Sequence, residues 1–496
     1  MKKYILAIDQ GTTSTRAIIF DKNSNIVSIA NKEIKQYYPN PGWVEQDANE
    51  IWLSVISTIT QALVLKNILP NQIEAIGITN QRETTILWDR DSGEPVYNAI
   101  VWQSRQTSRI CEDLKRKGYE SIIRAKTGLL IDPYFSGTKV KWILDNVKGV
   151  REKANKGKIA FGTVDSWLIY KLTGSLHMTD YSNASRTLLY NIHDLKWDDE
   201  LLDIMDIPKN ILPVVSDSSG LIGETSPRSF YGEKIPITGV AGDQQASLFG
   251  QLCCEEGMVN STYGTGCFVL MNTGSKIVVS ENGMLSTIAW KIKDKLVYAI
   301  EGSVFVGGSC IQWLRDGLKI IKSAEETESL AKELKTNEDV YLVPAFVGMG
   351  TPYWDSDAKG ALFGLTRGTN KRQIARAALE SICFQVQDVL KAMEADSKQP
   401  ISKIKATGGA TVNNYLMQFQ SDIMNTLVQR PHIMETTALG AAYLAGIACG
   451  YWQNIEDINK SKKDGTVFNP RMDEQTRVRL LLGWTKAIEA TRLFKL

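Results

Sequence analysis

An adjacent pair of opposite charges interrupts an apolar stretch early in the chain. Residues 78–89 read ITNQRETTILWD, with Arg82 and Glu83 between Ile78 and the apolar run that starts at Ile86. An arginine fork can donate two hydrogen bonds to neighbouring oxygens, whereas a carboxylate can only accept them. On local grounds alone, the simplest interpretation is a partly buried ion pair that closes a loop.

Three glycine-rich turns have the composition of phosphate-binding turns. DQGTTSTR (9–16) follows one apolar run, TYGTGCF (262–268) follows another, and ATGGATVNN (406–414) precedes a helical pattern. Such turns point several N–H groups into one concavity, which suits phosphate oxygens. The candidate phosphate-binding residues in the first two turns are Thr12, Thr13, Ser14, Arg16 and Thr265. In isolation, a plain hairpin turn is the simpler interpretation of the first two patterns, and capping of the following helix by Asn413 explains the third pattern equally well.

A carboxylate stands beside the first turn. Asp9 ends an apolar strand pattern two residues before Gly11, and a carboxylate beside a phosphate turn is a usual place to hold Mg²⁺ through water. A zinc site is not expected, because the three His residues lie far from one another and from every Cys. The seven Cys are scattered without a CxxC pair, which indicates reduced thiols and a cytoplasmic protein.

Bulk composition excludes several classes of protein. With 496 residues, 43% of them hydrophobic, the chain is long enough for two domains. A net charge of +2 without a dense basic block argues against nucleic-acid binding. Neither GxxxxGK[ST] nor a GxGxxG between strand and helix is present. The apolar run near the N-terminus is too short for a signal peptide, and the run near residue 440 is too short to span a membrane.

Hydrophobic periodicity predicts the strands and helices that position these residues. Residues 4–34 predict three strands, 47–66 a helix begun by Asp47 or Asn49, and 73–79 a further strand. The strand–turn–strand pattern recurs after residue 257, which predicts two domains of similar design that divide near residue 250. Residues 370–395 predict a helix that begins after Asn370 and buries one face, whose members are Ile374, Ala378, Ile382 and Val389.

Two longer patterns carry a family resemblance. YFSGTKVKWILDN (134–146) and GALFGLTRGTNKRQIARAALE (360–380), together with the three turns in this order, resemble the FGGY carbohydrate kinases of the actin-like ATPase superfamily. The resemblance covers essentially the whole chain. It implies an α/β fold of two actin-like (ribonuclease-H-like) domains, 1–250 and 251–496, that flank an interdomain catalytic cleft.

Within that family the chain looks like the members that phosphorylate glycerol. The segments that carry this likeness are DQGTTSTR, GWVEQD, NQRET, VWQSRQ, AGDQQASLFGQ and STYGTGCF. The resemblance implies that Arg82 and Glu83 hold substrate hydroxyls, and that Trp102 and Phe268 pack on the carbon chain. It implies further contacts from Tyr134 and Gln244. Core packing explains the aromatic residues equally well on local grounds.

The same resemblance assigns the chemistry. Asp243 would accept the proton of the attacking hydroxyl, although it could instead be a helix N-cap. Asp9 and Asp243 would hold Mg²⁺ through water, and the domains would close on glycerol and ATP to exclude water. The nucleotide contacts implied are Thr12, Thr13, Ser14, Arg16, Thr265, Gly308, Gln312, Gly409 and Asn413. A homodimer or homotetramer without stable membrane insertion is expected.

The chain departs from members of the family at two control points, one of which is a glycine-rich segment that binds fructose 1,6-bisphosphate in enteric members and is not evident here. Some members carry a phosphorylated His in an HFYG segment, and the matching residue here is Ser229, so that control is not expected. Two other interpretations stay open: a kinase for another small polyol or ketose, and a non-catalytic, actin-like ATP-binding scaffold.

Overall fold

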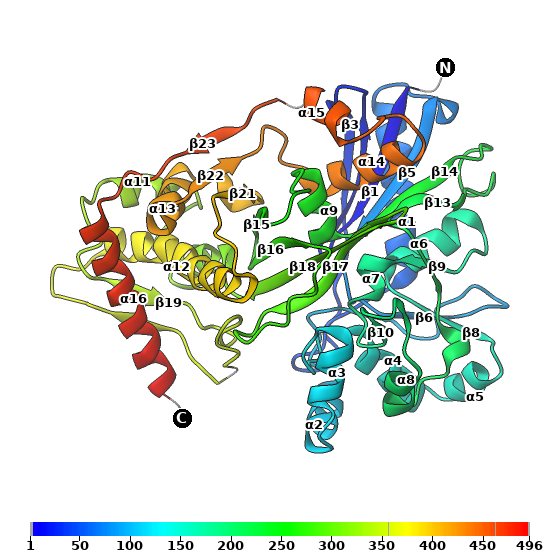
Figure 1. Ribbon diagram of the computed structural model, residues 1–496, viewed down its shortest axis with the longest axis horizontal. Coiled ribbons are helices and arrows are strands. Elements are labelled where there is room, and N and C mark those ends of the chain that lie inside the picture. The colour runs from blue at the N-terminus through cyan, green and yellow to red at the C-terminus, as the bar shows by residue number, and fades with distance from the viewer. Residues whose placement is uncertain (1–2, 356, 462, 495–496) are drawn as a thin grey trace. The chain divides into compact units, whose positions relative to one another are not determined.

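The computed structural model describes residues 3–355, 357–461 and 463–494, and their packing divides the chain into two units (Figure 1). Unit 1 consists of Met1–Leu252, Ser286–Tyr298 and Glu435–Lys462, and unit 2 of Cys253–Leu285, Ala299–Met434 and Lys463–Leu496. The units are therefore interleaved along the chain, a feature that a single division near residue 250 does not include.

A six-stranded sheet in the order β13-β14-β5-β1-β2-β3 forms the centre of unit 1. β1 pairs antiparallel with β2 and parallel with β5, and β5 pairs parallel with β14. The three strands predicted within 4–34 and the strand before Arg82 are confirmed. The strands of this sheet are β1 (Tyr4–Gln10), β2 (Ser14–Phe20), β3 (Ile26–Glu33), β5 (Ile73–Asn80), β13 (Ser219–Glu224) and β14 (Pro236–Gly242).

Helices α1 (Ala48–Leu65) and α14 (Thr436–Ala448) cover opposite faces of this sheet. Ile76 of β5 belongs to the same buried cluster as the inner side of α1, whereas a Cβ on the next residue, Gly77, would lie 2.2 Å from the Ala441 carbonyl oxygen of α14. Successive strand residues point to opposite faces, so the two helices lie on different sides. Asp47, one of the two residues predicted to begin α1, is its N-cap.

The remaining elements of unit 1 surround the sheet and extend from it. The short strands are β4 (Glu45–Gln46), β6 (Ile86–Asp89), β7 (Ala99–Ile100), β8 (Ile159–Gly162), β9 (Met178–Asp180), β10 (Tyr190–Asn191), β11 (Lys196–Trp197) and β12 (Val214–Ser216). The helices are α2 (Ser108–Arg116), α3 (Glu120–Thr127), α4 (Ser136–Asn146), α5 (Val150–Asn155), α6 (Val164–Thr173), α7 (Tyr181–Ala184), α8 (Asp199–Met205), α9 (Asp243–Gly250), α15 (Ile455–Ser461), η1 (Pro70–Gln72) and η2 (Lys209–Ile211).

A seven-stranded sheet, of which β15, β16, β21, β22 and β23 lie in unit 2, repeats the plan of the first. β15 pairs antiparallel with β16 and parallel with β21, as β1 does with β2 and β5. This confirms the predicted repeat of one design. The sheet order is β17-β18-β16-β15-β21-β22-β23, with β15 (Val259–Tyr263), β16 (Cys267–Gly274), β17 (Leu285–Ile292), β18 (Lys295–Val304), β21 (Lys403–Thr407), β22 (Leu427–Arg430) and β23 (Thr466–Phe468).

A long helix, α12 (Lys371–Ser397), packs in the core of unit 2 and starts after its cap, Asn370, as predicted. Three of the four residues predicted for its buried face are buried, but Ile374 is only partly buried, whereas its neighbour Gln373 is buried and donates to Glu338 Oε2. The other elements are α10 (Gly308–Gln312), η3 (Trp313–Gly317), α11 (Glu326–Lys332), η4 (Gly409–Val412), α13 (Asn414–Met424), α16 (Glu474–Leu493), β19 (Tyr341–Val343) and β20 (Ala361–Phe363).

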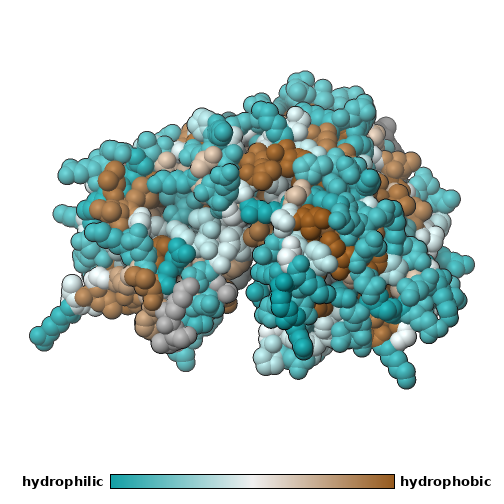
Figure 2. All heavy atoms as spheres, turned by 60° about the horizontal axis from the view of Figure 1, so that its bottom comes forward, coloured by the Kyte–Doolittle hydropathy of each residue, from teal (hydrophilic) through white to brown (hydrophobic). Residues whose placement is uncertain are grey.

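Within the part of the chain that the structure describes, one helix is long and apolar enough to cross a membrane. It is α1, in which 44% of the residues are buried within the protein, against the sheet of unit 1. The core helix of a globular domain passes the same test of length and composition. Figure 2 shows a face that is mostly hydrophilic, with hydrophobic side chains in separate patches.

Candidate active site

The turn between β5 and β6 buries both members of the Arg82–Glu83 pair. Arg82 is 3% and Glu83 is 1% exposed. Glu83 has φ of 62°, a left-handed conformation that is costly for a non-glycine residue. Its carbonyl oxygen accepts hydrogen bonds from Ser136 Oγ and Thr85 Oγ1, both at 3.0 Å. The surrounding residues therefore hold Glu83 in a backbone conformation that it would not adopt alone.

The two charges bind other partners more closely than each other. Arg82 Nε lies 3.0 Å from Asp243 Oδ1, and Arg186 Nε lies 2.6 Å from Glu83 Oε1. The separation between Arg82 Nε and Glu83 Oε1 is 3.9 Å. The ion pair is thus present and buried, but each member has a closer partner elsewhere in unit 1. Four residues of alternating sign, Arg186, Glu83, Arg82 and Asp243, form one series, which we call the charge chain.

Sequence reasoning missed Arg186. It follows α7 in the segment NASRT, lies 103 residues from Glu83 along the chain and has a fully buried side chain. No local pattern marks it. A search for a cation to balance a buried Glu83 could have suggested it, because buried carboxylates need a charged or hydrogen-bonding partner.

Asp243 stands where β14 ends and α9 begins. Gly242 is the N-cap and Asp243 is the first residue of the helix, so the predicted N-cap role of Asp243 is wrong by one position. Its Oδ1 accepts a hydrogen bond from Gln244 N at 2.7 Å. A Cβ on Gly242 would lie 2.6 Å from Cγ of Arg82, so only glycine lets the arginine stem run alongside. The corner thus aligns Asp243 with the Arg82 guanidinium.

Two aromatic residues lie beside the charge chain. The rings of Trp102 and Tyr134 meet edge to face at 5.5 Å, and Arg82 Nη2 donates to the Tyr134 hydroxyl at 3.4 Å. The structure thus brings Trp102, Tyr134, Arg82, Glu83 and Asp243 together in unit 1. Both rings are partly exposed, so they can present a flat face to a small ligand.

A buried lysine supports this wall from behind. Lys139 of α4 donates from Nζ to the carbonyl oxygens of Tyr134 at 2.5 Å and Phe135 at 3.2 Å. Burial lowers its pKa from 10.5 to about 7, against the opposing influence of Glu83. Within the family pattern YFSGTKVKWILDN, this lysine therefore has a structural function that sequence reasoning did not assign.

The predicted glutamine contact is also buried. Gln244 is 8% exposed, and its Oε1 atom has no hydrogen-bond partner among the described residues. A buried acceptor without a partner is costly unless a ligand or water supplies a donor. Its neighbour Gln245, not predicted, accepts a bond from Arg82 Nη1 at 3.3 Å.

The first glycine–threonine turn joins β1 and β2 in unit 1. Gly11 N donates to Ser14 O at 2.9 Å, which closes the turn, and Gln46 Nε2 holds the Thr12 carbonyl at 2.6 Å. Arg16 Nη1 lies 2.9 Å from Glu435 Oε2, a partner that sequence reasoning missed. The turn is thus fixed by its carbonyl groups, and its basic residue is held by a carboxylate.

Asp9 and Asp243 are the residues that could hold a divalent cation. Burial raises the pKa of Asp9 to about 7; Arg16 opposes this shift, and the negative charges of Glu435 and Asp243 add to it. A cation beside Asp9 would reverse that shift. No cluster of three or more His, Cys, Asp or Glu residues suited to a metal occurs in the described part of the chain. The pair therefore fits Mg²⁺ that takes its remaining ligands from phosphate and water.

In unit 2, the segments that carry the other predicted nucleotide contacts lie around one end of β15. The backbone N–H groups of Gly307 and Gly308 donate to the carbonyls of Thr265 and Gly264, both at 2.8 Å. A Cβ on Gly408 would lie 2.5 Å from the Tyr263 carbonyl oxygen. The hairpin turn, the start of α10 and the Gly-Gly turn are therefore neighbours. Thr265, Gln312 and Gly409 are exposed, and Gly308, Asn413 and Phe268 are partly so.

Asn413 caps α13, as one of its two interpretations predicted. Its Oδ1 accepts from Leu416 N at 3.0 Å, and its Nδ2 donates to Thr327 Oγ1 at 3.3 Å. Capping does not exclude a nucleotide contact, because the residue remains partly exposed.

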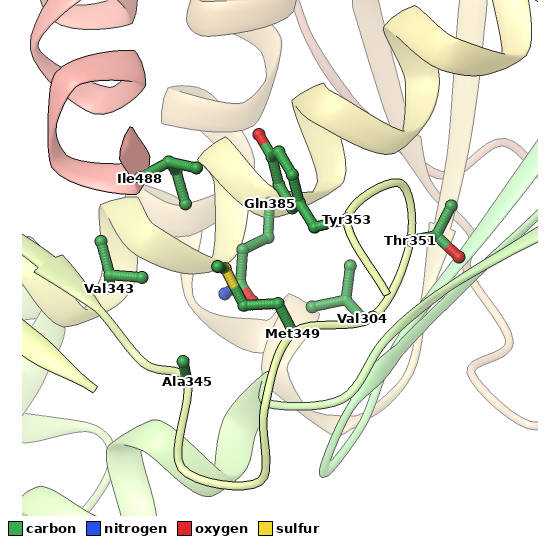
Figure 3. A pocket seen from close by; sticks show the side chains of 9 residues that line it. Val304, Val343, Ala345, Met349, Thr351, Tyr353, Gln385 and Ile488 are labelled. Carbon is green, nitrogen blue, oxygen red and sulfur yellow. The ribbon is translucent and has the colours of Figure 1, made fainter. Parts of the chain in front are cut away.

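A small pocket elsewhere in unit 2 has a different character. Figure 3 shows it between loop 344–353, α12 and α16, with Tyr353, Gln385 and Ile488 among its side chains. None of the predicted site residues lines it. Most of its lining is apolar, and we assign it no part in the candidate site.

The comparisons with known proteins agree along the whole chain. The model of the FGGY family of carbohydrate kinases, N-terminal domain, matches residues 4–250, and that of the C-terminal domain matches residues 259–449. A glycerol kinase of Bacillus licheniformis is 61% identical and one of Staphylococcus epidermidis 59% identical, each with full coverage of both chains. The crystal structure of Plasmodium falciparum glycerol kinase with ADP superposes with a TM-score of 0.93 at 37% identity, with 99% of each chain covered.

Proposed function

The chain belongs to the FGGY family of carbohydrate kinases, and from this premise we propose that it transfers the γ-phosphoryl group of ATP to glycerol, giving sn-glycerol 3-phosphate. The supporting observation is the contact of Arg82 Nε with Asp243 Oδ1 at 3.0 Å, beside the rings of Trp102 and Tyr134. It brings a hydroxyl-binding fork and a candidate base to one place. The glycerol kinases that match over the full length support the choice of substrate.

In this proposal the charge chain recognises hydroxyl groups. Arg82 donates to two neighbouring oxygens of glycerol, and Glu83 accepts a hydroxyl hydrogen. Gln244 Oε1, buried and without a partner among the described residues, accepts from another hydroxyl. Trp102, Tyr134 and Phe268 cover the carbon chain, which offers little apolar surface of its own.

Asp243 acts as the general base. The attacking hydroxyl must lose its proton as the oxygen meets the γ-phosphorus, and a carboxylate within hydrogen-bond reach can accept that proton. The Arg82 guanidinium at 3.0 Å and the N-terminus of α9 both favour the ionised carboxylate that a base requires.

The nucleotide contacts come from both units. Asp9 and Asp243 would hold Mg²⁺, which offsets negative charge on the transferring group when it is bound. The β- and γ-phosphates meet the first turn and Thr265, and Gly308, Gln312, Gly409 and Asn413 border the ribose and adenine. The residues proposed for the first turn are Thr12, Thr13, Ser14 and Arg16.

Water is the competing nucleophile in this reaction. We propose that the two units close on glycerol and ATP, so that water is excluded and the hydroxyl is aligned in line with the γ-phosphorus. Weak ATP hydrolysis without glycerol follows from this. We further propose a cytoplasmic homodimer or homotetramer.

The test is ADP production from ATP and Mg²⁺ with glycerol, dihydroxyacetone, glyceraldehyde, xylulose, ribulose and gluconate. The variant Asp243→Asn removes the base, and the matched control is Asp217→Asn, an aspartate of similar exposure paired with Lys291 at 2.7 Å. Turnover confined to glycerol and lost only in Asp243→Asn supports substrate and base. Turnover of a sugar instead contradicts the substrate, and no turnover of any compound favours the scaffold interpretation.

A further inference from the structure

Arg186 contacts two candidate substrate residues that come from separate segments. Its Nε donates to Glu83 Oε1 at 2.6 Å, and its guanidinium carbon lies 5.6 Å from the centre of the Tyr134 ring. Its side chain is fully buried, so it is placed to position these residues rather than to bind substrate directly.

We propose that Arg186 is a positioning residue that sets the selectivity for polyols by fixing Glu83 and Tyr134. This inference rests on the proposed phosphorylation of glycerol. It deepens that proposal by naming a residue behind the site that decides which hydroxyl groups are required.

The first step of the argument is charge. The charge chain contains two cations and two anions, and Arg186 is the nearer cation to Glu83, at 2.6 Å against 3.9 Å for Arg82. Arg82 Nε is thereby left to Asp243, at 3.0 Å. Without Arg186, two carboxylates would compete for one guanidinium. Glu83 would then draw Arg82 away from Asp243. The contacts proposed between these two residues and the substrate hydroxyls would therefore move.

The second step is geometry. The guanidinium lies 5.6 Å from the Tyr134 ring and 5.4 Å from the Phe135 ring, within the range of cation–π attraction. Lys139 holds the backbone carbonyls of the same two residues. Arg186 therefore holds the ring of Tyr134, and Lys139 holds its backbone carbonyl.

The third step is the left-handed backbone of Glu83. A residue with φ of 62° keeps this conformation only while its surroundings enforce it. Its carbonyl is held by two hydroxyls and its carboxylate by Arg186. Loss of the carboxylate partner would free the side chain to turn, so the acceptor for one substrate hydroxyl would no longer be fixed.

Selectivity follows from fixed acceptors. A site built to hydrogen-bond a hydroxyl rejects an analogue that lacks it, because the buried polar groups then have no partner. Propane-1,2-diol lacks one terminal hydroxyl of glycerol. The ratio of kcat/KM for glycerol to that for propane-1,2-diol therefore measures how firmly these groups are held.

The experiment compares Arg186→Met and Arg186→Lys with the wild type. The control is Arg90→Met, a partly buried arginine of unit 1 that contacts His177 at 3.0 Å and no candidate site residue. We expect Arg186→Met to lower kcat/KM for glycerol roughly 100-fold, in the range seen when one partner of a buried charge pair is removed. The glycerol-to-diol ratio should fall at least about tenfold. KM for ATP should change less than about twofold, because Glu83, Tyr134 and Phe135, which the guanidinium contacts, are not among the proposed nucleotide residues.

Arg186→Lys provides a second test in case Arg186→Met does not fold. It keeps the charge but loses the planar fork, so glycerol turnover should partly recover while the glycerol-to-diol ratio remains reduced. An unchanged glycerol-to-diol ratio in both variants overturns the inference. This includes the case in which kcat/KM falls equally for glycerol and for the diol.

The activity of the wild type distinguishes the proposed phosphorylation of glycerol from the proposed role of Arg186. A wild type that turns over glycerol, with both variants unchanged, contradicts the role of Arg186 alone. A wild type that prefers another polyol contradicts the substrate, and the ratio is then measured with that polyol and its deoxy analogue. Turnover of no polyol overturns both proposals.

Discussion

The indole of Trp102 donates a hydrogen bond from Nε1 to Oγ1 of Thr12 at 2.8 Å. This bond joins the aromatic wall of the candidate substrate site to the first glycine–threonine turn. The backbone N–H of Trp102 also donates to Thr84 Oγ1 at 3.2 Å, next to Glu83. One residue therefore connects the proposed glycerol contacts with the proposed phosphate contacts.

Trp102→Phe should weaken this connection while it keeps an aromatic ring against Tyr134. Loss of one hydrogen bond of this kind costs about 1 kcal/mol, so kcat/KM for glycerol should fall roughly fivefold. The measurement is steady-state kinetics on Trp102→Phe, Thr12→Val and the double variant. A coupling free energy of about 0.5–1.5 kcal/mol is expected from the cycle. Strict additivity would show that the bond does not contribute to catalysis.

Lys139→Met tests the buried lysine through the pH dependence of stability. The pKa of Lys139 is lowered by burial to about 7, while the unfolded chain keeps the ordinary value of 10.5. Unfolding therefore takes up a proton between these values, and the contribution of Lys139 to the free energy of unfolding rises with pH. Below about pH 7 the folded protein carries the full cost of a buried charge.

The free energy of unfolding of the wild type, minus that of Lys139→Met, should rise from pH 7 to pH 9 by about 1.4 kcal/mol per pH unit at most. Urea titrations at pH 6, 7, 8 and 9 measure it. Val140→Ala, at a buried position on the same helix without an ionisable group, should show a difference independent of pH. A difference for Lys139→Met that is equally flat would contradict the lowered pKa.

Local signals predicted the elements, because capping and periodicity act over a few residues. Asp47 before α1 and Asn370 before α12 both cap the helices that the sequence indicated. The repeated pairing of β1 and β15 was visible because each strand is followed by a glycine–threonine turn and a second strand. The N-cap of α9 was predicted one residue too late, at Asp243. The N-cap is Gly242, where a side chain would collide with Arg82.

Long-range partners could not be predicted in the same way. Glu83 and Arg186 are 103 residues apart, and Arg16 and Glu435 are 419 apart. Nothing within either segment specifies which distant charge will meet it. The interleaving of the units has the same cause, because α14 returns late in the chain to cover the sheet of unit 1.

Gly408 and Gly409 form a matched pair with opposite expectations. Gly408 has φ of +96°, and an added Cβ would lie 2.5 Å from the Tyr263 carbonyl oxygen, whereas Gly409 has nothing within 4 Å. Gly408→Ala should lower the free energy of unfolding by about 2 kcal/mol or more. Gly409→Ala should leave stability unchanged and raise KM for ATP, because the new methyl group would meet the proposed adenosine. Thermal unfolding and ATP kinetics check both, and an unchanged KM for ATP in Gly409→Ala would remove that residue from the nucleotide site.

Asn413 offers a way to separate a helix cap from a nucleotide contact. Asn413→Ala removes both Oδ1, which accepts from Leu416 N, and Nδ2, which donates to Thr327 Oγ1. Loss of the cap should lower the free energy of unfolding by about 1 kcal/mol. Asn413→Asp keeps the acceptor, so it should keep most of the stability. Its negative charge would repel phosphate, so KM for ATP should rise in Asn413→Asp more than in Asn413→Ala if this residue borders the nucleotide. Equal KM values for ATP in both variants and the wild type would leave Asn413 with the capping role alone.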